Sequence, residues 1–183
     1  MSTNNAVLEA ETTAPVPRRL GLVDDRQSAT PVDLLELAQE LGRGTGRWDR
    51  MGAERPTERT YHLLQRDADV EAWLIAWPTG GHLELHDHGQ SNGAFWVVDG
   101  RLEELYAHQR GATSSFGHRR HWAGSGVGFG PGYLHDVRNA DVAPALSVHV
   151  YSPPLESMTF FSMEQAGAVP ARLEERSSAT WEH

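Results

Sequence analysis

From residue 59 onward, hydrophobic and polar residues alternate in short runs separated by glycine, proline, aspartate and asparagine. A period of two places successive side chains on opposite faces of a β-strand. The runs are RTYHLLQ, VEAWLIAW, HLELHDH, GAFWVVDG, RLEELYAH, VGFGPG, LHDVRN and ALSVHVYS. Many short strands with turn residues between them are typical of an antiparallel sandwich or a closed barrel. The pattern therefore predicts an all-β fold.

One segment before these runs has the period of a helix. The stretch TPVDLLELAQELG begins with Thr30 as a cap and Pro31 in the first turn, positions that both residues favour. Its leucines and Ala38 recur on one side, which predicts a short N-terminal helix packed on the outside of the core. Gly42 is the residue expected to end this helix.

The whole chain has 183 residues, which suits one domain with a hydrophobic core. We expect residues 1–28, which are polar and lack a period, to form a mobile tail. Residues 29–165 are expected to form the single domain, including the helix. The charged residues 166–183 are expected to be a frayed helix or a tail.

Composition limits the function classes. The formal net charge of −9 argues against nucleic acid or an anionic membrane as a partner, and the chain has no cysteine to form disulfides or thiolate metal ligands. No apolar run is long enough to span a bilayer, and the first residues lack the order of a signal peptide. We expect a cytoplasmic protein, a monomer or weak homo-oligomer, whose partners are small molecules.

Two histidines, His86 and His88, flank Asp87 in the run HLELHDH. On a strand they share one face, while Asp87 points the other way and can form hydrogen bonds outside the site. A third imidazole has to come from another strand, and His135 in GPGYLHDVRN is the best candidate. The pattern predicts a metal site on His86, His88 and His135; the alternative is a polar strand edge without metal.

The glycines and histidines around these positions resemble the two motifs of the cupin superfamily. The matching positions are Gly80, His86, His88 and Gly100 in the first motif, and Gly124, Gly132, His135 and Asn139 in the second. The resemblance implies a double-stranded β-helix, or jelly-roll barrel. Many cupins carry a glutamate ligand where this chain has Gly93, so the site would hold three neutral histidines and no carboxylate.

Three neutral histidines have chemical consequences. They leave the full charge of a divalent ion, and about three open positions in an octahedral one, for an anionic ligand such as a thiolate. The familiar non-haem iron site has two histidines and one carboxylate. Zinc also accepts three histidines and water, so the ligands alone do not choose the metal.

A second group of polar residues lies in ALSVHVYSPP. Ser147, His149 and Tyr151 alternate with apolar residues and share one face of a strand. This face could lie in solvent. It could also form a hydrogen-bonded relay, in which the phenol of Tyr151 donates to or accepts from a metal ligand while His149 orients it.

Taken together, HDHGQSNGAFWVVDGRLEE, GPGYLHDVRN and SVHVYSPP resemble a bacterial cysteine dioxygenase or a sibling thiol dioxygenase of the cupin superfamily. The resemblance implies Fe(2+) held by His86, His88 and His135. It also implies Tyr151 close to this centre, linked by hydrogen bonds to His149 and Ser147. It further implies a cis Ser-Pro bond in SVHVYSPP. Animal members link the tyrosine covalently to a cysteine near position 93, and Gly93 rules out this link here.

The implied reaction converts a small thiol, with L-cysteine the first candidate, and dioxygen to the sulfinic acid. The alternatives are 3-mercaptopropionate or another thiol acid as the substrate, a different metal-dependent cupin enzyme acting on carbon, and a non-catalytic cupin that binds a metal or ligand.

Family members bind the substrate carboxylate through an arginine on an early strand. Arg59 is the candidate here, although it lies one or two residues from the expected position, and Arg66 is the second choice. Tyr151 could also contact this carboxylate, and His62 could line the pocket. His82 is expected at the barrel rim.

Two other groups carry weaker signals. The stretch HQRGATSSFGHRRHW contains three histidines but is rich in charged and small residues, which favours a solvated hairpin over a second metal cluster. The histidines are His108, His118 and His121. Four aromatic residues are expected in the core or the pocket wall, namely Trp73, Trp77, Phe95 and Trp96.

Overall fold

The computed structural model describes residues 28–44, 56–108, 116–164 and 167–176. Within these residues, one helix and eleven strands form. They are α1 (Pro31–Arg43), β1 (Thr60–Arg66), β2 (Glu71–Trp77), β3 (His82–His86), β4 (Asn92–Asp99), β5 (Arg101–His108), β6 (Phe116–Trp122), β7 (Gly126–Phe129), β8 (Tyr133–Arg138), β9 (Ala145–Ser152), β10 (Ser157–Glu164) and β11 (Gly167–Glu175). No helix among the described residues is long and apolar enough to cross a membrane.

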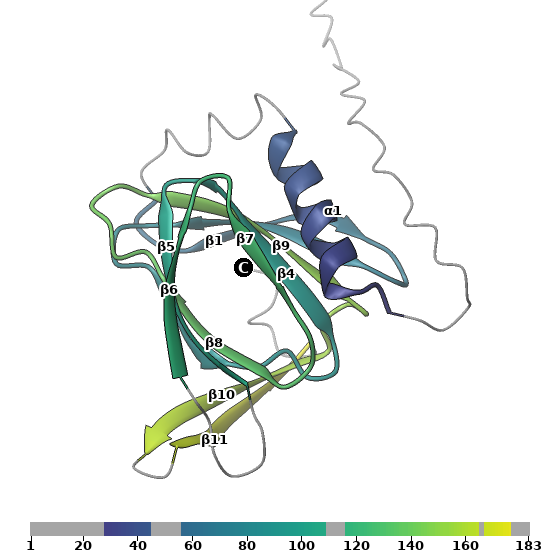
Figure 1. Cartoon of the computed structure of the whole chain (residues 1–183), viewed down its shortest axis with the longest axis vertical. Helices are drawn as coiled ribbons and strands as arrows, with labels where there is room; N and C mark the ends of the chain where they lie inside the picture. Colours follow the sequence, from purple (N-terminus) through teal and green to yellow (C-terminus); the bar gives the residue numbers. More distant parts are fainter. Residues whose placement is uncertain (1–27, 45–55, 109–115, 165–166, 177–183) are drawn as a thin grey trace, which may run out of the picture.

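The strands form two antiparallel sheets that face each other and close a barrel (Figure 1). One sheet has the order β1-β2-β9-β4-β7, and the other has the order β11-β10-β3-β8-β5-β6. Helix α1 lies against the outer face of the first sheet, over β4 and β9. The prediction of an all-β fold with an N-terminal helix is confirmed.

Helix α1 begins as predicted and ends slightly later. Thr30 and Asp33 form a capping box, in which the Thr30 hydroxyl accepts from the Asp33 N–H and the Asp33 carboxylate accepts from the Thr30 N–H. The helix continues through Gly42 and ends at Arg43. A Cβ at Gly42 would lie 2.9 Å from the Trp96 ring, so this glycine serves close packing on β4 instead of ending the helix.

Strand β9 is buried on both faces, which explains how it carries a polar row without reaching solvent. Its apolar residues, such as Val148 and Val150, pack in one cluster with Leu34 and Ala38 of the helix. The alternating polar row therefore faces the barrel interior. The interpretation of this row as a solvent face is wrong, because Ser147, His149 and Tyr151 are at most 6% exposed.

The end of the described chain is a strand, which corrects the expectation of a frayed helix or tail. Strand β11 pairs with β10 along its length, and β10 pairs with β3 where Phe160 lies opposite His86. The hairpin thus extends the sheet below the barrel (Figure 1). Most residues of β11 are exposed and its second half carries Arg172, Glu174 and Glu175, which suits an exposed edge strand. Residues 1–27 and 177–183 lie outside the described residues.

The β5–β6 hairpin does not place all of its histidines in solvent. His108 and His118 are exposed, as expected, but His121 is only 4% exposed and lies against Phe95, with ring centroids 4.7 Å apart. The expectation of a solvated hairpin is therefore wrong for His121. The reason is the strand period, which turns His121 inward although both of its neighbours are exposed.

Candidate metal centre and adjoining cavity

Three histidines from two paired strands meet in the barrel interior. His86 ends β3 and lies directly opposite His135 of β8, and His88 follows two residues after the strand has ended. Their ring centroids are 4.6 to 4.9 Å apart. A candidate ligand nitrogen of each lies within 4.8 Å of the other two. Among the described residues, no other group of three potential ligands meets this criterion.

Hydrogen bonds determine which nitrogen of two rings faces the centre. His86 Nδ1 donates to the backbone oxygen of Glu84 at 2.7 Å, and His135 Nδ1 donates to Glu104 Oε1 at 2.9 Å. Both rings therefore keep the lone pair of Nε2 free. Nε2 of His135 lies 3.3 Å from Nε2 of His88, and a ligand nitrogen of each of the three rings lies within 4.8 Å of the others, so the three can meet at one ion.

His88 is held by ring contacts. Phe129 lies against it with ring centroids 4.7 Å apart, and Tyr151 stacks on it at 5.4 Å. Its Nδ1 is buried without a hydrogen-bond partner. Asp87 turns outward, as predicted, and accepts hydrogen bonds from the backbone N–H groups of Gly89 and Thr159.

The site fits a divalent metal. Burial, reinforced by neighbouring imidazoles, lowers the pKa of His86 and His88 well below the usual value, so both rings are neutral and offer lone pairs. No carboxylate enters the group. A Cβ on Gly93 would lie 2.3 Å from the Phe129 ring, so no larger side chain fits there without a shift of that ring.

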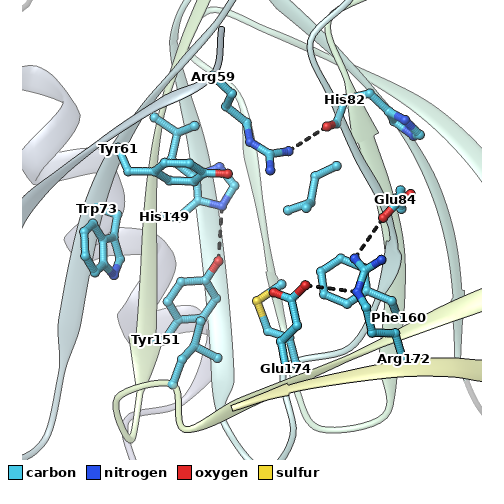
Figure 2. A pocket seen from close by; sticks show the side chains of 14 residues that line it. Arg59, Tyr61, Trp73, His82, Glu84, His149, Tyr151, Phe160, Arg172 and Glu174 are labelled. Atoms are coloured by element: carbon cyan, nitrogen blue, oxygen red, sulfur yellow. Dashed lines mark hydrogen bonds and ion pairs between the residues drawn. The ribbon is translucent and has the colours of Figure 1, made fainter. Parts of the chain in front are cut away.

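The polar row on β9 forms a connected chain of hydrogen bonds. Ser147 Oγ lies 2.9 Å from His149 Nε2, and His149 Nδ1 lies 3.4 Å from the Tyr151 hydroxyl, as Figure 2 shows for the second contact. The chain starts at Trp77, whose indole N–H donates to Ser147 Oγ at 2.8 Å. Burial lowers the pKa of His149 to about 3 and raises that of Tyr151, so both are neutral at ordinary pH.

A cavity of about 430 Å³ adjoins this chain, and both His149 and Tyr151 line it. Arg59 and Tyr61 line the same side, and Figure 2 shows the guanidinium of Arg59 pointing into the space between Tyr61 and His82. Trp73, Ile75, Leu83, Leu155, Met158 and Phe160 supply apolar wall. The predicted core aromatics Trp77 and Phe95 are fully buried, and Trp96 packs against the helix cluster.

Arg59 is the cavity's uncompensated cation. Its Nη1 donates to the backbone oxygen of His82 at 2.6 Å, and its guanidinium lies 5.2 Å from the centroid of the Tyr61 ring. Among the described residues, no carboxylate lies within ion-pair distance of it, and its Nε is buried without a partner. Arg66, the second choice, is outside the cavity and pairs with Glu71.

Two predictions about rim histidines have different outcomes. His62 is exposed and does not line the cavity, because strand alternation turns Tyr61 inward in its place. His82 lies at the rim, as expected, with its ring 2.6 Å from Asp136 Oδ2. It does not share the face of His86, because the β3–β8 pairing is irregular between Leu83 and His86.

Several residues of the site escaped motif reasoning. Glu104 is fully buried, and although burial raises its pKa, hydrogen bonds from His121, His135 and Tyr133 bring it well below the usual value. The signal for Glu104 is its position two residues after Leu102, which puts both side chains on the same, buried face of β5. The cavity mouth also holds Arg172, which pairs with Glu84 and Glu174, each at 3.0 Å.

The fold and the site define a cupin, a double-stranded β-helix with a buried histidine group that could bind a metal ion. A family profile described as Cysteine dioxygenase type I matches residues 1–164 of the chain. The protein therefore belongs to the cysteine dioxygenase type I family. The cis Ser152–Pro153 bond that the sequence resemblance implied is also present.

Solved structures share the fold at low sequence identity. Oxalate oxidase in complex with glycolate has a TM-score of 0.50 and 18% identity, over 57% of this chain and 56% of that chain. This protein thus spans little more than half of the oxalate oxidase length. The Bacillus halodurans protein BH2720 has a TM-score of 0.49 and 19% identity, over 62% of this chain and 86% of that chain. Identities this low show the fold alone.

Proposed function

We propose that this protein is a mononuclear non-haem Fe(II) thiol dioxygenase that converts L-cysteine, or another small thiol with a carboxylate, to the sulfinic acid. In the balanced reaction, a thiol RSH and one O₂ give RSO₂H, so both oxygen atoms end on sulfur. Membership of the cysteine dioxygenase type I family supports the reaction type. The buried histidine triad without a carboxylate supports a centre that leaves room for an anionic ligand.

One observation carries the proposal. Arg59 and Tyr151 line a single cavity, and the Tyr151 ring stacks on His88 of the metal group. The three histidines do not line the cavity themselves, but Tyr151 and Phe160 of its wall contact His88 and His86. A small molecule whose carboxylate pairs with Arg59 would therefore have its other end on the side of the cavity next to the metal group. An arginine without a carboxylate partner, in a partly apolar cavity, is well suited to bind such an anion.

The iron would supply the redox and coordination chemistry that lets dioxygen react with a thiolate. The protein's own residues would hold and orient the reactants. Arg59 would bind the substrate carboxylate and hold the substrate in place. This reduces the entropic part of the activation free energy. Tyr151 would donate its hydroxyl proton in a hydrogen bond to a reactant, and the aromatic wall would exclude water.

A second candidate substrate is 3-mercaptopropionate. Both acidic side chains that line the cavity, Glu84 and Glu174, are engaged by Arg172. A substrate amine would therefore have no free carboxylate to pair with in the cavity, whereas the carboxylate of either substrate could pair with Arg59. This arrangement favours a thiol acid for which the amine is not required.

The proposal is tested with a panel of thiols. Protein loaded with Fe(II) is incubated with cysteine, 3-mercaptopropionate, mercaptosuccinate and cysteamine, and oxygen uptake and sulfinate are measured. We expect equal amounts of oxygen consumed and sulfinate formed with at least one carboxylated thiol, and much slower uptake with cysteamine. Protein loaded with Zn(II) is the control. No uptake above this control with any thiol would overturn the proposal.

The proposed substrates also agree with a cytoplasmic location, where small thiols are kept reduced. The location, the oligomeric state and the exclusion of nucleic acid and membrane partners stay predictions from the sequence.

A further inference from the structure

Glu104 is a fully buried carboxylate on β5 whose four acceptor positions are all occupied. Oε1 accepts from His135 Nδ1 at 2.9 Å and from the Tyr133 hydroxyl at 2.7 Å. Oε2 accepts from His121 Nε2 and from Arg119 Nε, each at 2.7 Å. These donors come from the two strands that flank β5, so the carboxylate is fixed in position from both sides.

The fixed carboxylate determines the state of His135. A carboxylate can only accept, so the facing Nδ1 must carry the hydrogen and Nε2 must carry the lone pair. That Nε2 is the atom that faces His88 Nε2 at 3.3 Å. The opposite tautomer would point an N–H at the place where a metal ion would bind and would leave Glu104 without a donor.

The carboxylate also stands close to a site that has no acidic ligand. Gly93 cannot supply one, and Glu104 reaches the centre only through the His135 ring. Arg119 opposes its charge, but that side chain is 34% exposed, whereas the contact to His135 is completely buried. Solvent screens the first interaction more than the second. A carboxylate on the remote nitrogen makes an imidazole a better metal ligand.

We propose that Glu104 is a positioning residue of the metal centre, which holds His135 with Nε2 toward the ion and provides, through the imidazole, the negative charge that the ligands lack. The inference rests on metal binding by the histidine triad, as the proposed function does, but it requires neither a thiol nor dioxygen.

The test measures Zn(II) affinity of the full-length protein by competition with a chromogenic chelator. Glu104→Gln keeps the size of the side chain and removes its charge, and it should weaken binding about 10- to 100-fold. The matched control is Glu103→Gln on the same strand. Glu103 pairs with Arg120 and Arg138 on the outer face, so its loss should leave the affinity unchanged.

A spectroscopic measurement separates positioning from a general structural role. In Zn(II)-loaded wild-type protein, nitrogen-15 NMR should show His135 protonated on Nδ1, with a slowly exchanging proton that shifts in Glu104→Gln. Equal Zn(II) affinity of this variant and the wild type would overturn the inference and leave the proposed function intact. If the variant does not fold, the wild-type spectrum decides, and a proton on Nε2 of His135 in the metal-free protein would overturn the inference. A wild-type protein that binds neither Zn(II) nor Fe(II) would overturn both.

Discussion

The indole N–H of Trp77 donates a hydrogen bond to Ser147 Oγ at 2.8 Å, from β2 to the neighbouring β9. Because an indole can only donate, Ser147 accepts this bond, and its own hydrogen is available for a hydrogen bond to His149 Nε2. If Ser147 donates in this way, His149 donates from Nδ1 to the Tyr151 oxygen, which leaves the Tyr151 hydrogen free for a ligand in the cavity. A fully buried tryptophan thus occupies one acceptor position of the serine at the start of the relay.

Removing the serine hydroxyl should disturb this direction. In Ser147→Ala, the nitrogen of His149 that faces the serine loses its donor, and the ring can adopt the other tautomer. We expect kcat for the thiol to fall about tenfold with the iron content unchanged, since orienting groups contribute less than the 100-fold or more of direct proton transfer. Ser125→Ala, which removes an exposed hydroxyl, is the control. An unchanged kcat in Ser147→Ala would remove the relay from the mechanism.

Tyr151→Phe removes the last donor of the relay and preserves the ring that stacks on His88. We expect kcat to fall about 100-fold, while metal analysis finds as much iron as in the wild type. Tyr61→Phe removes a hydroxyl from the same cavity but outside the relay, so it should lower kcat less. The account would be contradicted if both variants lost activity equally.

Arg59→Gln should raise KM for carboxylated thiols about 10- to 100-fold, as expected when one charged hydrogen-bond partner is lost. The rate with cysteamine, which has no carboxylate, should not change. Arg66→Gln is the matched control, because Arg66 lies on the adjoining strand but pairs with Glu71 outside the cavity. A similar loss with cysteamine would mean that Arg59 acts on the fold and does not bind the carboxylate.

A methyl group at Gly93 should be poorly tolerated. The added Cβ would lie 2.3 Å from the Phe129 ring, which itself packs on His88. We expect Gly93→Ala to reduce the free energy of unfolding by about 1–3 kcal/mol, measured by urea denaturation, and to weaken metal binding. Adding Phe129→Leu should restore part of the stability, and no recovery would show that the clash lies elsewhere.

The pH dependence of stability follows from His149. Burial lowers its pKa from 6.5 to about 3 in the folded protein, so the unfolded chain gains a proton first as the pH falls. Stability from this group is therefore complete above pH 6.5 and decreases toward pH 3, by about 1.4 kcal/mol per pH unit. The free energy of unfolding of metal-free protein is measured by urea denaturation at about pH 7 and about pH 5. Between these two values it should fall less for His149→Gln than for the wild type. An equal decrease in both proteins would contradict the lowered pKa of His149.

Sequence reasoning identified residues whose role depends on a local pattern. The i, i+2 spacing of His86 and His88 and the alternation along β9 were visible because strand geometry relates such neighbours directly. The sequence alone does not decide whether the β9 polar row faces inward, since this depends on helix α1 covering the opposite face. That contact joins segments more than a hundred residues apart.

The missed residues depend on pairings that no local pattern encodes. Glu104 and His121 meet because β5 and β6 pair in one particular register, and a shift by one residue would turn Glu104 outward. Arg172 reaches the cavity because β11 forms a hairpin with β10, in a segment whose charge suggested a tail. Arg59 lines the cavity although it lies just before β1 begins, so strand alternation alone does not predict its direction.

The most direct test of the metal centre is X-ray absorption spectroscopy of the Fe(II)-loaded protein with and without the thiol that it oxidises. We expect one iron per chain with imidazole scattering from three histidines, loss of iron in His135→Ala, and a sulfur scatterer that appears when the thiol is added. Iron that stays bound in His135→Ala, or a thiol that adds no sulfur scattering, would contradict the account.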